Sequence, residues 1–387
     1  MNEYGSRETP FPSIDHKEKI LYKGLTVHSE YITMRDGVEI AVSYCLPKGM
    51  DSGTRIPAAL FQTRYWRTRR IRAPLGWFVN EVFGNRPVPQ VLTSRGYATI
   101  HVDVRGTGAS TGHRPEGPFS KAEIEDGREI IDWIVRQPWS NGEVIPLGVS
   151  YVGSTSEFCA ALGHSATRAC MPLHSFWDAY TDVVFPGGVY DQRFMQMWSF
   201  FGRSLDLNSS HAFKEVRPLY YYLLRSVTPV NSDPDEIKLR AVVEEHAQNQ
   251  YVDDLTQDYD YSDDTTPEGL DLASRSLYPY ANSLGRTGIP IYTICSWYDS
   301  GYGEAVINKF LNLENPMIAI LGDWNHGAAE PVKIGRRRPK RINRDLKDIK
   351  HHWHHHADFF DTCLRGDGIQ GKTLFYYTVG QEEWKRT

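Results

Sequence analysis

Cysteine is scarce in this chain, which has five among its 387 residues: Cys45, Cys159, Cys170, Cys295 and Cys363. An odd, small number at wide spacing argues against a disulfide framework. Three of the five fall in apolar stretches expected to form strands or helices, where a thiol packs as a small apolar group. We therefore expect buried free thiols.

Excess charge and long apolar runs are also missing. The 43 Lys and Arg against 48 Asp and Glu give a net charge of −5, whereas a nucleic-acid partner favours a basic excess. We interpret two basic clusters, 64–72 and 336–341, as solvated loops. No apolar run approaches the roughly 18 residues of a membrane span, and the polar amino terminus does not match a signal peptide. We expect a cytoplasmic protein without a nucleic-acid or membrane partner, and leave a homo-oligomer open.

Two patterns that could bind a cofactor or a metal are incomplete. Gly106 and Gly108 follow an expected strand, but Thr111 stands where a dinucleotide fingerprint has its third glycine. The histidine-rich run 351–356 has pairs at three- and four-residue spacing that could chelate a metal. It lacks the carboxylate of a zinc-protease motif and continues as a helical pattern, which indicates a surface helix. We expect no cofactor and no metal.

The chain does contain short apolar strands that alternate with helical patterns, as in α/β folds. Asp36-Gly37 is the turn of an expected hairpin over 31–46. The other strands are expected at 58–63, 97–104, 143–147, 168–173, 289–295 and 317–321. Amphipathic helices are expected at 121–137, before Pro138, and at 303–313.

A serine lies where one of these strands meets a helix. Ser150 is the centre of Gly148-Val149-Ser150-Tyr151-Val152-Gly153, between the strand 143–147 and a helical stretch. The nucleophile elbow of hydrolases has the pattern Gly-x-Ser-x-Gly. Here Val152 holds the place of the second glycine, and Gly153 follows one residue later. By itself the pattern fits either a nucleophile or a plain strand-to-helix turn.

An acid and a base follow in a suitable order. Asp299 comes just after the strand 289–295, and His326 just after 317–321. Carboxyl ends of parallel strands are where open α/β sheets gather their chemistry. The order Ser, Asp, His is that of the α/β-hydrolase fold. Asp178 is a second choice for the acid, and His174 for the base.

Five segments in this order resemble the X-prolyl dipeptidyl peptidase and cocaine-esterase (CocE/NonD) family of serine hydrolases. Three of them surround the expected catalytic residues: Gly148-x-Ser150-Tyr151-x-Gly153, Trp297-Tyr298-Asp299 and Trp324-x-His326-Gly327. The other two, 103–110 and 34–40, are similar to the Asp-x-Arg-Gly segment and the opening hairpin of the family. The resemblance covers about residues 25 to 380.

The resemblance implies a role for each of these residues. Ser150 would be the nucleophile, His326 the base and Asp299 the acid that orients it. The backbone N–H of Tyr151 and the hydroxyl of Tyr65 would hold the oxyanion. Family members hydrolyse esters or amides through an acyl-serine and need no metal.

We predict an α/β-hydrolase fold in two parts, 25–174 and 281–366, with a helical cap inserted at 175–280. The aromatic-rich start of the cap would either line an acyl pocket or pack the cap on the core. Relatives carry a β-rich jelly-roll domain after the hydrolase domain. We interpret 372–387 as the start of such a domain, apparently incomplete.

The predicted function is that of a serine hydrolase that cleaves an ester or amide bond of a small acyl compound. One alternative is a dipeptidyl peptidase that releases X-Pro from a short peptide. That activity needs an anionic site for the free amine, and Ser300-Gly301 after Asp299 offers no carboxylate. The other alternative is a hydrolase-fold binding protein without chemistry, against which the intact Ser150, Asp299 and His326 argue.

Overall fold

The chain folds around a large mixed sheet. The computed structural model describes residue 10 and residues 19–75, 81–83, 87–216, 218–257, 259–267, 271–326, 349–364, 368–381 and 383–387. The sheet has the strand order β1-β2-β6-β3-β7-β8-β10-β11-β12-β13. Its strands are β1 (Leu25–Thr33), β2 (Glu39–Pro47), β3 (Ile56–Thr63), β6 (Ala98–Asp103), β7 (Ser140–Val149), β8 (Met171–Leu173), β10 (Ile291–Ser296), β11 (Met317–Gly322), β12 (Lys372–Thr378) and β13 (Glu383–Arg386).

The middle of this sheet is parallel. All neighbours from β6 to β12 run parallel, while the β1–β2 hairpin and β13 join the two edges antiparallel. Each strand expected from the sequence is present, and the bounds shift by a few residues. Apolar side chains of the inner strands point to both faces, so helices must cover both.

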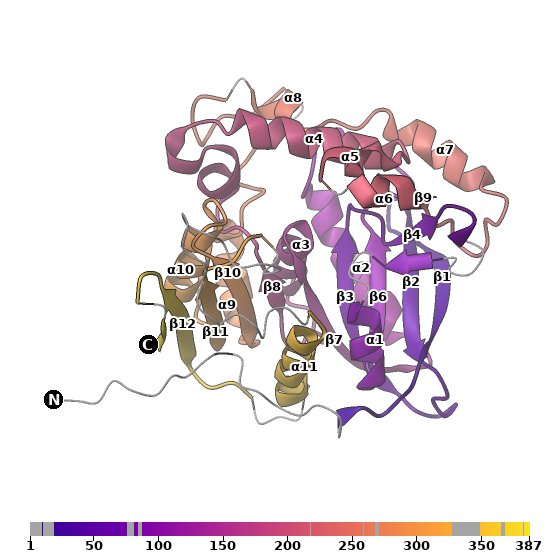
Figure 1. The fold of residues 1–387 in the computed structure, drawn as a ribbon, viewed down its shortest axis with the longest axis horizontal. Coiled ribbons are helices and arrows are strands. Elements are labelled where there is room, and N and C mark those ends of the chain that lie inside the picture. Colours follow the sequence, from indigo (N-terminus) through magenta and orange to yellow (C-terminus); the bar gives the residue numbers. More distant parts are fainter. Residues whose placement is uncertain are drawn as a thin grey trace.

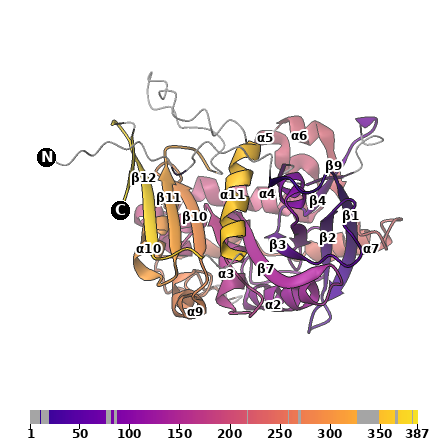
Figure 2. The same cartoon turned by 90° about the horizontal axis from the view of Figure 1, so that it is seen from below.

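Helices lie on both faces of the sheet (Figure 1, and Figure 2 from below). On one face lie α1 (Pro87–Ser94) and α11 (Ile349–Leu364). On the other lie α2 (Lys121–Val135), α3 (Tyr151–Ala161), α9 (Ala281–Thr287) and α10 (Tyr302–Asn312). Successive side chains of strand β7 point to opposite faces of the sheet. Val144 packs on the side of α2, and Ile145 packs on the side of α1.

A helical layer follows in the sequence between β8 and β10. It contains α4 (Gln192–Asp206), α5 (Phe213–Val216), α6 (Pro218–Leu223), α7 (Ile237–His246) and α8 (Val252–Thr256), which lie along the top of the molecule in Figure 1. Strand β9 (Leu224–Val227) pairs with β4 (Thr68–Ile71), which also pairs with β5 (Glu81–Phe83). Shorter helical turns occupy 180–184, 186–188, 210–212 and 278–280. The exact cap boundaries, 175 and 280, stay a prediction.

The last strands are placed differently from our expectation. Residues 372–387 were expected to open a separate jelly-roll domain, but β12 pairs in parallel with β11 from Met317↔Lys372 to Leu321↔Tyr376. Strand β13 then pairs antiparallel with β12. The apolar side chains of 374–377 can be buried by extending the hydrolase sheet, which the sequence pattern alone could not distinguish from a new β domain.

The first arginine cluster is not a solvated loop throughout. Arg67 is fully buried and pairs with the buried carboxylate of Asp103 at 2.8 Å. Arg64 is also buried, with Asp206 of α4 at 3.1 Å. The same Asp103 accepts the Ala109 N–H at 3.0 Å, which makes the Asp-x-Arg-Gly segment a compact turn against β6. The second basic cluster, 336–341, lies outside the described residues.

The histidine-rich helix is likewise not a surface helix. In α11, Trp353, His355 and His356 are buried. The ring of His356 lies 5.4 Å from that of Tyr292 on β10. Trp353 belongs to the core on the sheet face beside α1. The side chains of His351 and His352, which belong to the possible metal-chelating pairs of the run, lie outside the described residues.

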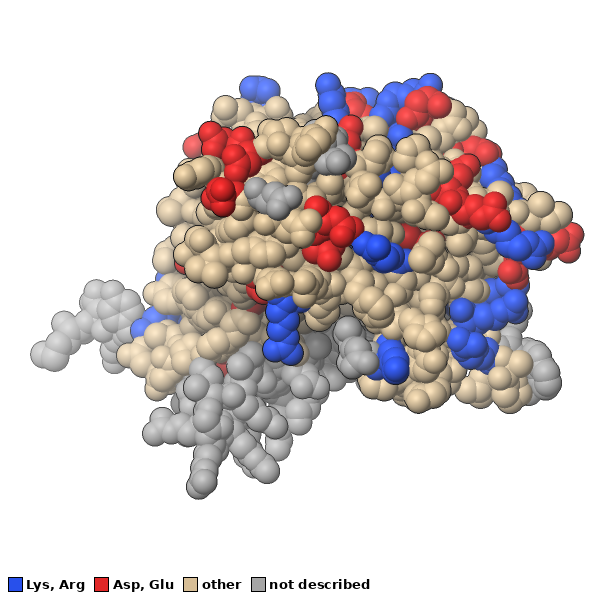
Figure 3. Space-filling model, turned by 90° about the horizontal axis from the view of Figure 1, so that it is seen from above, with Lys and Arg blue, Asp and Glu red and all other residues tan. Residues whose placement is uncertain are grey.

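The cap face viewed in Figure 3 mixes both charges. Basic and acidic side chains lie side by side among uncharged ones over the described part of this face. None of the five cysteines, all of which the structure describes, forms a disulfide, and four of them are buried, as expected. Among the helices that the structure describes, none combines the length and the apolar character needed to cross a membrane.

Candidate active site

The expected site residues meet at one edge of the sheet. Strands β3, β7, β8, β10 and β11 are parallel neighbours in the sheet, so their carboxyl ends share an edge. The residues that follow these ends include Tyr65, Ser150, His174, Asp299 and His326. The topology therefore gathers chemistry-bearing side chains from five separate segments, as open α/β sheets do.

Ser150 has the strained backbone of a nucleophile elbow. It stands between β7 and α3 with φ 64° and ψ −126°. A non-glycine residue in such a region costs about 1–3 kcal/mol and persists where the surroundings fix it. The Ser150 N–H donates to the Leu173 carbonyl at 2.8 Å, and the Ser150 carbonyl accepts the Ser154 N–H at 3.0 Å. Ser150 itself is half-buried.

The displaced second glycine of the motif has a packing reason. A Cβ at Gly153 would lie 2.6 Å from the Leu173 carbonyl oxygen, because α3 passes directly over β8 there. A Cβ at Gly148 would clash with the Val152 side chain. The helix α3 therefore approaches the backbone of β8 most closely at Gly153, three residues after Ser150. A glycine is needed there and not at Val152.

Asp299 and His326 form a hydrogen-bonded pair. Nδ1 of His326 lies 2.8 Å from Oδ1 and 2.9 Å from Oδ2 of Asp299. The carboxylate is buried, whereas the His326 side chain is 44% exposed and so reachable from solvent. Burial alone would raise the pKa of Asp299, but its hydrogen bonds with His174 and His326 outweigh burial and hold the pKa well below its usual range. Asp299 therefore stays ionised and accepts the Nδ1–H of His326.

The loops that carry this pair are joined to each other. The Trp297 N–H donates to the Gly322 carbonyl at 3.0 Å, and the Ser296 hydroxyl donates to the Trp324 carbonyl. Trp324 is fully buried, and a Cβ at Gly322 would collide with its ring. The Trp-x-His motif thus anchors the loop after β11 by its indole and leaves His326 at the surface. Between Ser150 and His326, both described, the structure records no hydrogen bond.

The two second choices have different positions. Asp178 accepts hydrogen bonds from the Tyr180 N–H at 2.9 Å and the Ser276 hydroxyl at 3.2 Å, within the segment that enters the cap. His174 is buried, and its Nδ1 lies 2.6 Å from Oδ2 of Asp299. The sequence signal for this contact was available, since His174 directly follows β8 at the same sheet edge.

Tyr65 lies beside Tyr151, the residue after Ser150, and contacts the helical layer. Its hydroxyl accepts a hydrogen bond from Nε1 of Trp198, on α4, at 2.7 Å. Its ring packs edge-on against that of Tyr151, with 5.9 Å between centroids. Burial raises the pKa of the Tyr65 hydroxyl, so the hydroxyl keeps its proton. Because the indole uses only an oxygen lone pair, the phenolic hydrogen remains available as a donor. The sequence did not reveal this role of Trp198.

Tyr151 is fixed from behind. Its hydroxyl donates to Glu123 and accepts from Arg114 at 2.9 Å, and Arg114 also pairs with Glu123 at 2.9 Å. All three side chains are buried. Tyr151 is the first residue of α3, so its N–H has no intrahelical acceptor. The ring is thereby held in place while the N–H stays available next to Ser150.

A buried ion pair supports α3, the helix that follows Ser150. Lys309 of α10 lies 2.9 Å from Oε1 of Glu157 on α3, and its ammonium also donates to the Ser175 hydroxyl at 2.6 Å. Both charged side chains are almost completely buried. The pair joins α3, α10 and the segment after β8. Sequence patterning did not indicate it, because each residue alone looks like an ordinary polar position on a helix.

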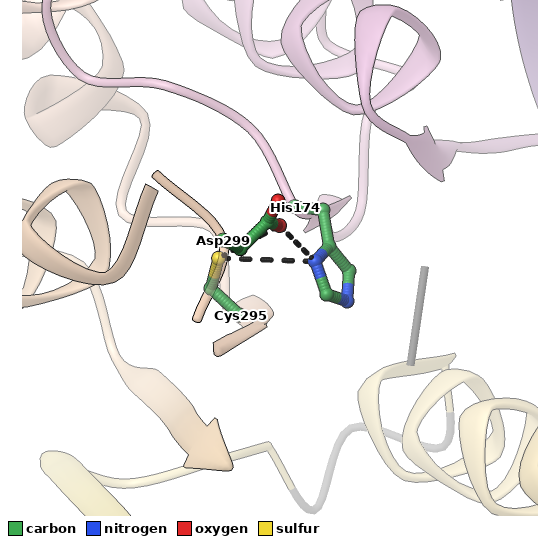
Figure 4. Close-up of side chains that lie close together, drawn as sticks. All are labelled: His174, Cys295 and Asp299. Atoms are coloured by element: carbon green, nitrogen blue, oxygen red, sulfur yellow. Dashed lines mark hydrogen bonds and ion pairs between the residues drawn. The ribbon is translucent and has the colours of Figure 1, made fainter. Parts of the chain in front are cut away.

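One group in the described residues has the geometry of metal ligands. His174, Cys295 and Asp299 offer ligand atoms that all lie within 4.8 Å of one another (Figure 4). The Asp299 carboxylate is already engaged by two imidazoles. Burial raises the pKa of the Cys295 thiol well above its usual value, so it is not a thiolate. The arrangement fits hydrogen bonding around a carboxylate better than metal coordination.

The sheet order, the serine turn after β7 and the His–Asp pair after β10 and β11 together define an α/β-hydrolase.

Comparisons with known proteins agree with this assignment to the α/β-hydrolases. The profile of the X-Pro dipeptidyl-peptidase (S15) family matches residues 36–328. A provisionally named serine esterase of Mycobacterium bovis is 34% identical over 397 residues, which cover 94% of this chain and 61% of the relative. Cocaine esterase of a Rhodococcus species is 26% identical over 382 residues, covering 92% and 58%. A CocE/NonD family hydrolase structure from Staphylococcus aureus superposes with a TM-score of 0.61 at 17% identity, covering 98% and 61%.

The chain belongs to the X-Pro dipeptidyl-peptidase (S15) family of hydrolases. This confirms the family resemblance of the sequence motifs, and the S. aureus structure confirms the fold class. The chain spans about three-fifths of the length of the curated relatives that it matches.

Proposed function

We propose that this protein is a serine hydrolase that cleaves an ester or amide bond of a small acyl compound through an acyl-serine intermediate. The observation that carries the proposal is the hydrogen bond between Asp299 and the exposed His326, at the sheet edge where Ser150 stands on its strained turn. Family membership and the esterase names of the relatives support the same reaction.

Ser150 is the nucleophile. Nε2 of His326 takes the proton of the Ser150 hydroxyl while Oγ forms a bond to the substrate carbonyl carbon. The imidazolium then gives this proton to the leaving alcohol or amine, whose bond to the acyl carbon breaks. Water repeats both steps on the acyl-serine, and the acid product leaves. Throughout, the ionised Asp299 keeps the imidazole in its Nδ1–H tautomer and stabilises the imidazolium.

Two donors hold the oxyanion. The Tyr151 N–H points from the start of α3, and the Tyr65 hydroxyl comes from the segment after β3, the region from which hydrolases draw their second donor. Trp198 supports the second donor, because its indole fixes the Tyr65 oxygen and leaves the phenolic hydrogen free to donate. Donors that are held in place before the reaction stabilise the developing charge most effectively.

Tyr65→Phe should lower kcat with little change in KM. The ring and its packing are kept. The variant loses the hydrogen bond that strengthens in the transition state, and the Trp198 indole N–H loses its acceptor. The expected loss is about 2 kcal/mol or more, the scale found for one oxyanion donor. Steady-state kinetics of the purified variant measure it.

Tyr44→Phe is the matched control, because Tyr44 lies on β2 and packs with Trp133 and Trp139 far along the sheet. It should leave kcat unchanged. A Tyr65→Phe enzyme within twofold of the wild type in kcat would show that the hydroxyl belongs to the pocket wall and not to the oxyanion hole.

The reaction class is tested with a substrate panel. We expect turnover of p-nitrophenyl esters of short acids to exceed turnover of X-Pro-p-nitroanilides. The reason is that Ser300 and Gly301, which directly follow the acid, supply no carboxylate for a substrate amine. Preference for the X-Pro substrates would assign the protein as a dipeptidyl peptidase, and a lack of turnover on every substrate would favour a binding protein.

A further inference from the structure

The carboxylate of Asp299 is shared by two histidines. Its Oδ2 lies 2.6 Å from Nδ1 of His174 and 2.9 Å from Nδ1 of His326. The two rings face each other edge-on, with 5.3 Å between centroids. They differ in environment, because His326 is 44% exposed and His174 is 1% exposed. A catalytic Ser–His–Asp arrangement needs one histidine, so the second contact requires an explanation.

The protonation state of His174 follows from its surroundings. Burial lowers the pKa of His174 against the opposing influence of its hydrogen bond to Asp299. The ring is therefore neutral and carries one N–H. That hydrogen must be on Nδ1, since an ionised carboxylate lies 2.6 Å away and can only accept. Nε2 is then a bare acceptor, and it is buried with no hydrogen-bond partner among the described residues.

The backbone also holds His174 in an uncommon conformation. It has φ 50°, and its N–H donates to the Ile294 carbonyl of β10 at 2.7 Å. Positive φ is uncommon for a residue with a side chain, although histidine and asparagine adopt it more readily than most. This turn at the end of β8 is what directs the imidazole of His174 toward Asp299 (Figure 4).

We propose that His174 is a positioning residue, which fixes the Asp299 carboxylate by a hydrogen bond from Nδ1 and so sets how strongly Asp299 acts on His326. The proposal rests on the proposed function, since it assigns His326 as the base. A short hydrogen bond from a buried donor orients the carboxylate, as outer partners orient the ligands of other sites. It also engages part of the carboxylate's negative charge, which would otherwise act on His326 alone.

The groups that face Asp299 and His326 are few in the described residues. Asp299 is contacted by His174, by His326 and by the neutral Cys295 thiol, with Sγ 3.6 Å from Oδ2. His326 is faced by Asp299, by His174 and by the ring of Tyr302 at 5.6 Å. Burial raises the pKa of Tyr302 well above its usual value, so Tyr302 stays neutral. His174 is thus the neighbour best placed to alter the Asp299–His326 pair.

The test compares His174→Leu with His174→Asn. Leucine fills much of the space without a donor, whereas the asparagine amide can donate to Asp299 and tolerates the positive φ. Active sites are first counted by fluorophosphonate labelling, so that kcat refers to folded enzyme. We expect His174→Leu to lower kcat roughly tenfold with KM nearly unchanged, and His174→Asn to recover most of the loss.

The pH profile supplies the readout that a packing role would not change. His326 must be neutral to act as a base, so activity falls on the acid side as it becomes protonated. Without the His174 donor, more of the Asp299 charge acts on His326 and favours its protonated form. The acid limb of kcat/KM should therefore move to higher pH in His174→Leu, by about half a unit or more. In His174→Asn it should stay near that of the wild type.

Nitrogen-15 NMR of the wild-type enzyme, labelled in histidine, provides a test without mutation, in case His174→Leu does not fold. We expect His174 to remain neutral with its hydrogen on Nδ1 across the range of activity. The proposal is overturned by an Nε2–H tautomer, by an unmoved acid limb in His174→Leu, or by equal losses in both variants. Failure of Ser150 to label would instead overturn the proposed function, and the tautomer of His174 could still be measured.

Discussion

Ser150→Ala is expected to abolish hydrolysis while leaving the fold intact. In a serine hydrolase the loss of the nucleophile costs roughly 10⁶-fold in kcat. The hydroxyl is not a packing group, since the turn is held by backbone hydrogen bonds of Ser150 with Leu173 and Ser154. Alanine has the same Cβ and adds no atom, so the backbone strain at φ 64° is unchanged.

A fluorophosphonate probe provides the measurement. It should attach to Ser150 in the wild-type chain, as peptide mass spectrometry would show, and should not attach to the Ser150→Ala variant. Ser154→Ala is the matched control, because Ser154 is buried one turn along the same helix and its variant should label normally. Labelling at another serine would remove Ser150 from the mechanism.

Asp299→Asn should lower kcat by about 10⁴-fold, as in a well-studied triad in which the amide leaves the imidazole in the wrong tautomer. The structure gives a further reason here. The carboxylate accepts from two imidazoles, and an asparagine offers a single acceptor oxygen together with an N–H₂ donor. One histidine would then face a donor in place of an acceptor. We expect the fold to persist because the residue keeps its size.

Asp178→Asn is the comparison that tests the choice of acid. Asp178 accepts the Tyr180 N–H and the Ser276 hydroxyl, and an amide oxygen can still accept such bonds, so its effect on kcat should be mild. Both variants are measured for kcat/KM and thermal unfolding. If the Asp178 variant lost turnover and the Asp299 variant kept it, the acid would be Asp178, which follows β8, and not Asp299.

The sequence determined the fold class and allowed the main candidate site residues to be selected. Apolar strands that alternate with helices imply a parallel sheet, and parallel strands place the residues after their carboxyl ends at one edge. Ser150, Asp299 and His326 could be selected in this way, because each lies just past an apolar strand. The displaced Gly153 belongs to the same local information, although its packing reason against Leu173 appeared only in the structure.

The contacts between segments distant in sequence were decided by the tertiary structure. His174 and Asp299 are 125 residues apart, and Tyr65 and Trp198 are 133 apart. The same holds for Lys309 with Glu157 and for β12 with β11, which looked from sequence like the start of another domain. Local patterning reports which face of an element is apolar, but it carries no information on which partner is buried against it. The contacts of His174 with Asp299 and of Trp198 with Tyr65 arise only once β8, β10 and α4 are packed together.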